Sequence, residues 1–131
     1  MNATGSVLLD TSVVISYFRR DTSLHRKIGQ LSDVYMPLVV LGELLYGAYR
    51  SILRPKMRAQ VEAFSKGCIL ILPDETTADL YGQIKTALAI AGKPIPQNDI
   101  WIAATAKQHN LPVATRDQHF SFVSGLNVLR W

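Results

Sequence analysis

The feature that most constrains the fold is a regular alternation of short apolar runs with longer amphipathic ones. Five runs have the length and aliphatic character of buried strands: "SVLLD" at 6–10, "VYMP" at 34–37, "CILIL" at 68–72, "LPVAT" at 111–115 and "LNVLR" at 126–130. Helical patterns fill the intervals at 11–20, at 23–32, after Pro37, at 56–67, at 74–92 and at 98–110. This alternation predicts one α/β domain over residues 1–131, with a central, mostly parallel sheet flanked by helices.

Four carboxylates lie where such a fold brings distant segments together. Asp10 ends the first predicted strand, and Asp117 follows the strand at 111–115. Asp99 opens the helix at 98–110, and Glu43 is the only charge in the apolar segment "MPLVVLGELLYGA". The ends of parallel strands and the starts of the following helices share one edge of the sheet, where sites usually form. We therefore expect all four side chains to face a common crevice.

Each acid also has an ordinary structural interpretation. Asp10 could cap the helix that follows it, and either Asn98 or Asp99 could cap the helix at 98–110. Asp117 could simply form a turn. Glu43 lies in mid-helix with no basic residue one turn away, so only an exposed polar stripe would account for it.

Taken together, the four acids predict a cation site. Clustered carboxylates repel one another unless a proton or a cation neutralises them. Oxygen ligands select hard divalent ions such as Mg²⁺ or Mn²⁺. The three histidines have no zinc-binding spacing, and His119, close to Asp117, is expected at the surface more often than in a site.

Charge and cysteine content limit the classes of partner and the cellular compartment that we expect. The formal net charge of +4 favours a polyanionic partner such as nucleic acid, although many domains are mildly basic. The single cysteine, Cys68, cannot form an internal disulfide, and the start "MNATGSVLLD" lacks the pattern of a secretory signal. No apolar stretch is long enough to cross a bilayer. A cytoplasmic protein is therefore expected.

At these residues the sequence resembles the PIN-domain family, and within it the VapC-type ribonuclease toxins of toxin–antitoxin systems. Four stretches carry the resemblance, in the family's order: "VLLDTSVVI", "VVLGELLYGA", "NDIWIAATAKQHNLPVAT" and "TRDQHF". The resemblance implies that the acidic quartet is Asp10, Glu43, Asp99 and Asp117. It adds as supporting residues Thr11 or Ser12, Asn98, Thr115 and, from its place before Asp117, Arg116.

The resemblance implies an Mg²⁺- or Mn²⁺-dependent endoribonuclease that cleaves structured RNA, such as tRNA or rRNA. A small VapB-like antitoxin would neutralise it, and a homodimer would be its common form. In the corresponding mechanism, Asp10 and Asp99 are the main metal ligands, and Asp117 completes the coordination or holds a second metal position. Glu43 would orient a water at the ion or act as a base.

Basic residues near the motifs are candidates for holding the RNA backbone: Arg19, Arg20, Arg50, Arg54, Lys93 and Arg116. Trp101 and Tyr46 could stack on bases, although a role in the core or in a dimer interface is favoured for both.

Two other functions compete with this interpretation. A PIN-like module could bind RNA or protein without cutting, but such a groove gains nothing from four repelling acids. A phosphatase or receiver domain would also use an acidic pocket. However, Ser12 stands where a dehalogenase-like phosphatase needs a second Asp, and a receiver's paired acids are not evident.

Overall fold

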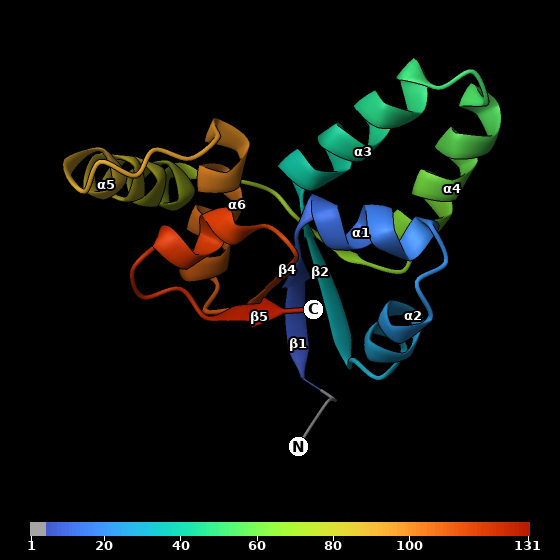
Figure 1. Cartoon of the computed structure of the whole chain (residues 1–131), viewed down its shortest axis with the longest axis horizontal. Helices are drawn as coiled ribbons and strands as arrows, with labels where there is room; N and C mark the ends of the chain where they lie inside the picture. Colours follow the sequence, from blue (N-terminus) through green and yellow to red (C-terminus); the bar gives the residue numbers. More distant parts are fainter. Residues whose placement is uncertain (1–4) are drawn as a thin grey trace.

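The computed structural model describes residues 5–131, so the predicted domain limits of 1–131 extend over four residues that lie outside the described part. The strands are β1 (Ser6–Leu9), β2 (Asp33–Pro37), β3 (Ile69–Ile71), β4 (Val113–Thr115) and β5 (Val128–Arg130). The helices are α1 (Thr11–Phe18), α2 (Thr22–Gly29), α3 (Leu38–Arg50), α4 (Arg54–Lys66), α5 (Glu75–Ile90), α6 (Gln97–Gln108) and the short 3₁₀ helix η1 (Gln118–Phe122). Each predicted strand and helix has a counterpart (Figure 1).

The five strands form one sheet in the order β3-β2-β1-β4-β5, and every pairing in it is parallel. The predicted parallel α/β architecture is confirmed. The chain first builds outward from β1 through β2 to β3, and then returns to add β4 and β5 on the other side of β1. The boundary between β1 and β4 is therefore the point where the strand order reverses, which is the usual ligand-binding position in such sheets.

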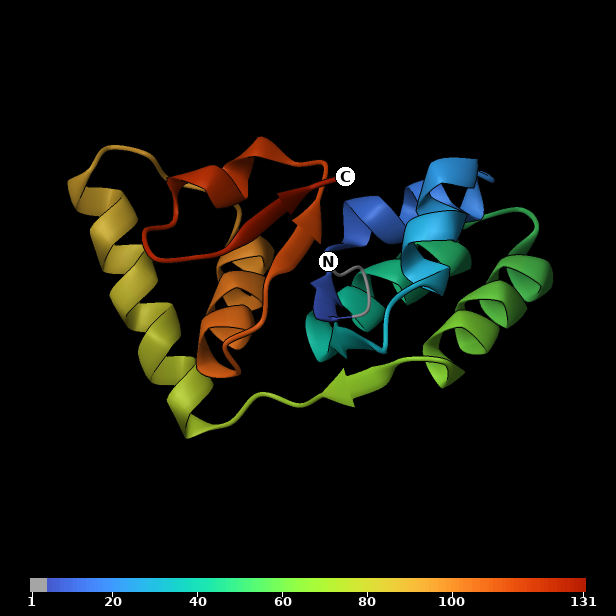
Figure 2. The same ribbon diagram turned by 90° about the horizontal axis from the view of Figure 1, so that it is seen from below.

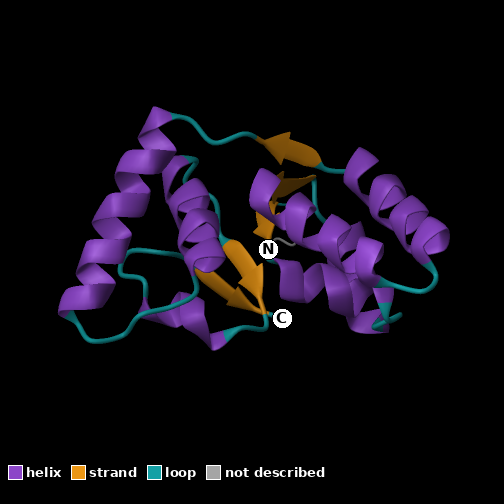
Figure 3. Ribbon diagram, turned by 90° about the horizontal axis from the view of Figure 1, so that it is seen from above, coloured by secondary structure: helices purple, strands orange, loops and turns teal. Residues whose placement is uncertain are grey.

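Helices cover both faces of the sheet. Helices α1–α4, from the first two connections, lie on one side, and α5 and α6 lie on the other (Figure 2). Figure 3 shows the central strands between these two groups of helices, with the edge strand β3 less covered. This double cover explains why the strand sequences are apolar runs without polar alternation.

The core lies between the sheet and its helices, directly beneath the reversal point. Leu8 and Leu9 of β1 and Val113 of β4 have no exposed surface. Ile102 of α6 and Phe120 of η1 are equally buried. The alanines of α6 are also buried: Ala103, Ala104 and Ala106. The strand ends that carry the acids therefore rest on a tightly packed base.

Local sequence signals fix the helix ends. Asp21 caps α2 by accepting the backbone N–H groups of Ser23 and Leu24. Asp74 and Thr77 form a capping box at the start of α5, and Gly92, with φ of +69°, follows the end of that helix. No helix among residues 5–131 is both long enough and apolar enough to span a membrane.

Candidate active site

Asp10 lies at the carboxyl end of β1 with only 3% of its surface exposed. Its Oδ2 accepts hydrogen bonds from the hydroxyls of Thr115 (2.7 Å) and Ser12 (2.8 Å), and its Oδ1 accepts the backbone N–H of Thr11 (2.7 Å). Burial raises the pKa of Asp10, while these donors oppose the rise and the nearby charge of Asp117 adds to it. Asp10 also caps α1 as predicted, so capping and a place in the site are compatible.

Asp99 reaches the same region from the first turn of α6, where it is buried. Burial raises its pKa to about 6; a hydrogen bond with His119 opposes the rise, and the charges of Asp10 and Asp117 add to it. The prediction that Asn98 or Asp99 caps this helix is wrong, because α6 begins at Gln97 and its cap position is Pro96. Both side chains are consequently free to point at other groups.

Asp117 and His119 come from the segment that follows β4. Oδ1 of Asp117 accepts the backbone N–H of His119 (2.9 Å) and so begins η1. The Nδ1 atom of His119 lies 3.0 Å from Oδ1 of Asp117 and 2.8 Å from Oδ2 of Asp99. His119 thus joins two acids, whereas the sequence favoured a surface position for it.

Glu43 is half-buried on α3, where it links two other elements of the site. Its Oε1 accepts the hydroxyl of Thr11 (2.6 Å), and its Oε2 accepts the side-chain amide of Asn98 (3.2 Å). These donors come from the starts of α1 and α6, so Glu43 is not part of an isolated polar stripe. A mid-helix carboxylate in an apolar segment therefore has two hydrogen-bond partners that hold its orientation.

The remaining predicted supporting residues tie the first and last acids together. The Thr115 hydroxyl, besides donating to Asp10, accepts the backbone N–H of Asp117 (2.9 Å). The Ser12 hydroxyl, besides donating to Asp10, accepts the backbone N–H of Arg116 (3.1 Å). The hydroxyls of Ser12 and Thr115 therefore link the end of β1 to the segment after β4 by hydrogen bonds.

Arg116 points away from the acids. Its Nη2 forms a 2.8 Å ion pair with Asp21, and its Nε donates to the main-chain oxygen of Trp131 (2.8 Å). Hydrogen bonds from Ser23 and then from Arg116 lower the pKa of Asp21 to about 2. Sequence proximity to Asp117 therefore does not make Arg116 a neighbour of that carboxylate.

The donor set fits a divalent cation. Among residues 5–131, ligand atoms of Asp99, Asp117 and His119 all lie within 4.8 Å of one another. Asp10 lies outside this group of three, but its charge reaches both other aspartates and contributes to the raised pKa of Asp99. Burial and the repulsion between carboxylates raise the pKa values of Asp10 and Asp99. A bound cation would offset the cost of both negative charges.

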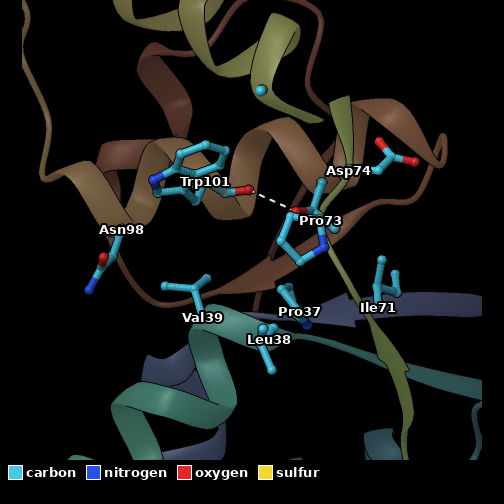
Figure 4. Close-up of a pocket in the computed structure, with 10 residues that line it drawn as sticks. Pro37, Leu38, Val39, Ile71, Pro73, Asp74, Asn98 and Trp101 are labelled. Atoms are coloured by element: carbon cyan, nitrogen blue, oxygen red, sulfur yellow. Dashed lines mark hydrogen bonds between the residues drawn. The ribbon is translucent and has the colours of Figure 1, made fainter. Parts of the chain in front are cut away.

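Two cavities adjoin the site. One, of about 470 Å³, lies between α1, α3 and α4, and its lining includes Glu43 and the basic residues Arg19, Arg20 and Lys56. The other, of about 510 Å³, is mainly apolar and is drawn in Figure 4. It reaches the site through Asn98.

The two candidate stacking residues differ in their surroundings. Trp101 lines the apolar cavity with one ring face stacked on Tyr81 at 4.1 Å. Tyr46 is 63% exposed, so its interpretation as a core residue is wrong. Among the described residues, no hydrogen bond joins either of these two side chains to one of the four acids.

A doubly wound parallel sheet with carboxylates gathered at its reversal point defines the class of protein. Residues 7–126 match the family model described as "PIN domain". The chain belongs to the PIN-domain family.

Named relatives and solved structures agree with this membership. The chain is 34% identical to the toxin FitB of Neisseria gonorrhoeae, over 93% of this chain and 95% of FitB. It is 30% identical to the tRNA(fMet)-specific endonuclease VapC of Shigella flexneri, over 95% and 96% of the two chains. In the crystal structure of FitAcB from N. gonorrhoeae, a chain 30% identical superposes with a TM-score of 0.82 over 95% of this chain and 96% of that one.

Proposed function

We propose that this protein is a metal-dependent endoribonuclease and the toxin of a toxin–antitoxin pair. The observation that carries the proposal is the grouping of Asp99 and Asp117, with Asp10 joined to Asp117 through Thr115 and Glu43 joined to the neighbours of Asp10 and Asp99. These are the acids that the family resemblance assigns to catalysis. Relatives aligned along nearly the whole chain are named as ribonucleases, which supports the same chemistry.

In this proposal Asp10, Asp99 and Asp117 hold Mg²⁺ or Mn²⁺. Such an ion neutralises the scissile phosphate and the developing charge on the leaving oxygen. The three carboxylates are suited to this task because burial and repulsion already make their shared negative charge costly. The hydroxyls of Ser12 and Thr115 keep the Asp10 carboxylate in position, as outer partners of ligands commonly do.

Glu43 is the proposed general base. Its two oxygens are held by Thr11 and Asn98, so its orientation is fixed before a substrate arrives. Each oxygen retains a lone pair, which can accept a proton from the attacking water. Because Glu43 is only half-buried, water has access to it.

The RNA backbone would follow the basic side of the site. Arg19, Arg20 and Lys56 line the cavity that ends at Glu43, and phosphate contacts there would position RNA without reading its sequence. Arg50, Arg54 and Lys93 are also exposed and remain candidates. A structured RNA such as tRNA or rRNA is the proposed substrate class, and one relative is named for cleavage of tRNA(fMet).

A VapB-like antitoxin is the proposed inhibitor. One solved structure with this fold, VapBC-5 from Mycobacterium tuberculosis, is described as a member of the VapBC family of toxin-antitoxin systems, and another as FitAB bound to a DNA fragment. We further infer a homodimer and a cytoplasmic location, where the antitoxin and the RNA substrates would be present. A non-catalytic RNA- or protein-binding module is the competing function.

Brief induction in a bacterial host tests the proposal. The wild-type chain alone should slow growth and should produce new RNA ends at defined sites, mapped by sequencing 5′ ends. Asp10→Asn should produce neither effect at equal soluble expression. Co-expression of the cognate antitoxin should restore growth. Unchanged growth and unchanged RNA ends with abundant soluble wild-type protein would favour the non-catalytic module.

A further inference from the structure

The Nδ1 atom of His119 lies between two acids of the quartet, and the proposed function gives it no part in metal binding. We propose that His119 binds the divalent ion directly through Nδ1, beside Asp99 and Asp117. This nitrogen ligand shifts the preference of the site from Mg²⁺ toward Mn²⁺ and the later first-row ions. The inference rests on the proposed function, because it names a ligand and an ion for the same site.

The spacing of the three donors is the first argument. Nδ1 of His119 lies 2.8 Å from Oδ2 of Asp99 and 3.0 Å from Oδ1 of Asp117. Adjacent ligands of an octahedral ion, each about 2.1 Å from it, lie about 3 Å apart. The two observed separations match this value, so the donors can share an ion without a large movement of either main chain.

Hydrogen bonding alone does not explain the arrangement. A single imidazole N–H can point directly at only one of two acceptor oxygens. Nδ1 nevertheless faces two carboxylates at nearly equal distances, and these carboxylates repel one another. A cation attracts both oxygens and the nitrogen lone pair at once, and therefore accounts for all three positions.

The main chain at His119 is held in place by a hydrogen bond and by the buried residue that follows it. Its backbone N–H donates to Asp117 (2.9 Å), and the next residue, Phe120, is completely buried in the core. The side chains of His119, Asp117 and Asp99 are 38%, 34% and 13% exposed. A protein-held face with an open outer side is the arrangement that lets an ion enter and still bind substrate.

The consequence is a change in metal preference. Mg²⁺ binds carboxylate oxygen and water well and imidazole poorly, whereas first-row transition ions accept imidazole readily. A site with three carboxylates alone would not separate Mg²⁺ from Mn²⁺ strongly. The added nitrogen should make Mn²⁺ the more tightly bound of the two.

Pulsed electron paramagnetic resonance of the Mn²⁺-loaded full chain tests the ligand directly. Protein labelled with [¹⁵N]histidine should show the nitrogen coupling of a bound imidazole, changed from that of unlabelled protein. His119→Asn should remove the coupling, while the control His109→Asn, on the exposed end of α6, should keep it. The label comparison uses wild-type protein, so it gives an answer even if His119→Asn does not fold.

Calorimetric titration separates a ligand from a positioning role. In His119→Asn the Mn²⁺ affinity should fall about tenfold or more, while the Mg²⁺ affinity should change less than about threefold. An equal loss for both ions would mean that His119 only orients the carboxylates. Mn²⁺ binding and RNA cleavage without nitrogen coupling would overturn this inference and leave the proposed function standing. Absence of any Mn²⁺ binding by the wild type would overturn the proposed function itself.

Discussion

The hydroxyl of Thr115 donates a 2.7 Å hydrogen bond to Oδ2 of Asp10, 105 positions away in the sequence. The same hydroxyl accepts the backbone N–H of Asp117 (2.9 Å). One buried side chain thus sets the relative positions of the first and last acids, across the boundary where the strand order reverses.

Thr115→Val should therefore weaken both stability and cleavage. Valine keeps the shape but leaves the buried Asp10 carboxylate with one donor fewer, which should lower the free energy of unfolding by about 1.5–3 kcal/mol. Urea denaturation measures this loss. The control Thr105→Val removes a buried hydroxyl that donates to the main chain of Trp101, and should cost about 1 kcal/mol or less without changing cleavage. Equal losses in both variants would contradict the special role of Thr115.

Asp99→Asn should stabilise the metal-free protein in a pH-dependent way. The pKa of Asp99 is about 6 in the fold against 3.8 for an unperturbed group, so the native state binds more protons between these values. The contribution of Asp99 to the free energy of unfolding is therefore fully present below about pH 4, where the carboxyl is protonated in both states. It is lost as the pH rises through 6 and the buried carboxyl ionises.

In EDTA at pH 8, Asp99→Asn should be more stable than the wild type by about 1–2 kcal/mol, and the difference should vanish near pH 4. Urea denaturation at several pH values measures it. Asp79→Asn, on the exposed face of α5, controls for the substitution itself. If the wild type instead gained stability relative to Asp99→Asn between pH 4 and 6, the pKa of Asp99 would be lowered in the fold rather than raised.

Glu43→Gln should separate catalysis from folding. Glutamine can still accept the Thr11 hydroxyl but cannot take a proton from water, so cleavage should fall about 10²–10⁴-fold. Thermal unfolding should change little. The control Glu62→Gln breaks only an exposed pair with Arg58 and should leave cleavage unchanged. Substantial cleavage by Glu43→Gln would assign the base to another group.

Arg116→Ala should affect stability only slightly. The pair between Arg116 and Asp21 is about one-third exposed, and solvent screens such pairs, so its loss should leave the urea midpoint almost unchanged. If Arg116 also contacts RNA, its removal should reduce the salt dependence of RNA binding by about one phosphate contact. Asp21→Asn is the matched control, because it frees the guanidinium without removing it. An unchanged salt slope in Arg116→Ala would limit this residue to a structural role.

The sequence predicted the fold and singled out four acids as site candidates, because both inferences follow from the position of residues along elements. Apolar runs set the strands, and the acids follow strand ends or lie near helix starts. Glu43 was distinguished by the absence of any helical partner, and its actual donors, Thr11 and Asn98, lie at the starts of two other helices.

Side-chain direction in the loops was not predictable in the same way. His119 reaches Asp99 only because η1 turns immediately after Asp117, and Arg116 turns away to meet Asp21. Neither direction leaves a periodic signal in the sequence. The two-residue step from Asp117 to His119, with the apolar Phe120 next, is the one hint that a short buried turn could present the imidazole.

The most direct test of the central claim is RNA cleavage by the purified, EDTA-treated chain as Mn²⁺ is added. Metal-dependent catalysis requires no cleavage without the ion, cleavage that saturates with Mn²⁺, and a rise in the thermal midpoint over the same concentration range. Asp10→Asn should show neither response. A chain that cleaves RNA equally well in EDTA, or that neither binds Mn²⁺ nor cuts RNA at millimolar concentrations of the ion, would contradict it.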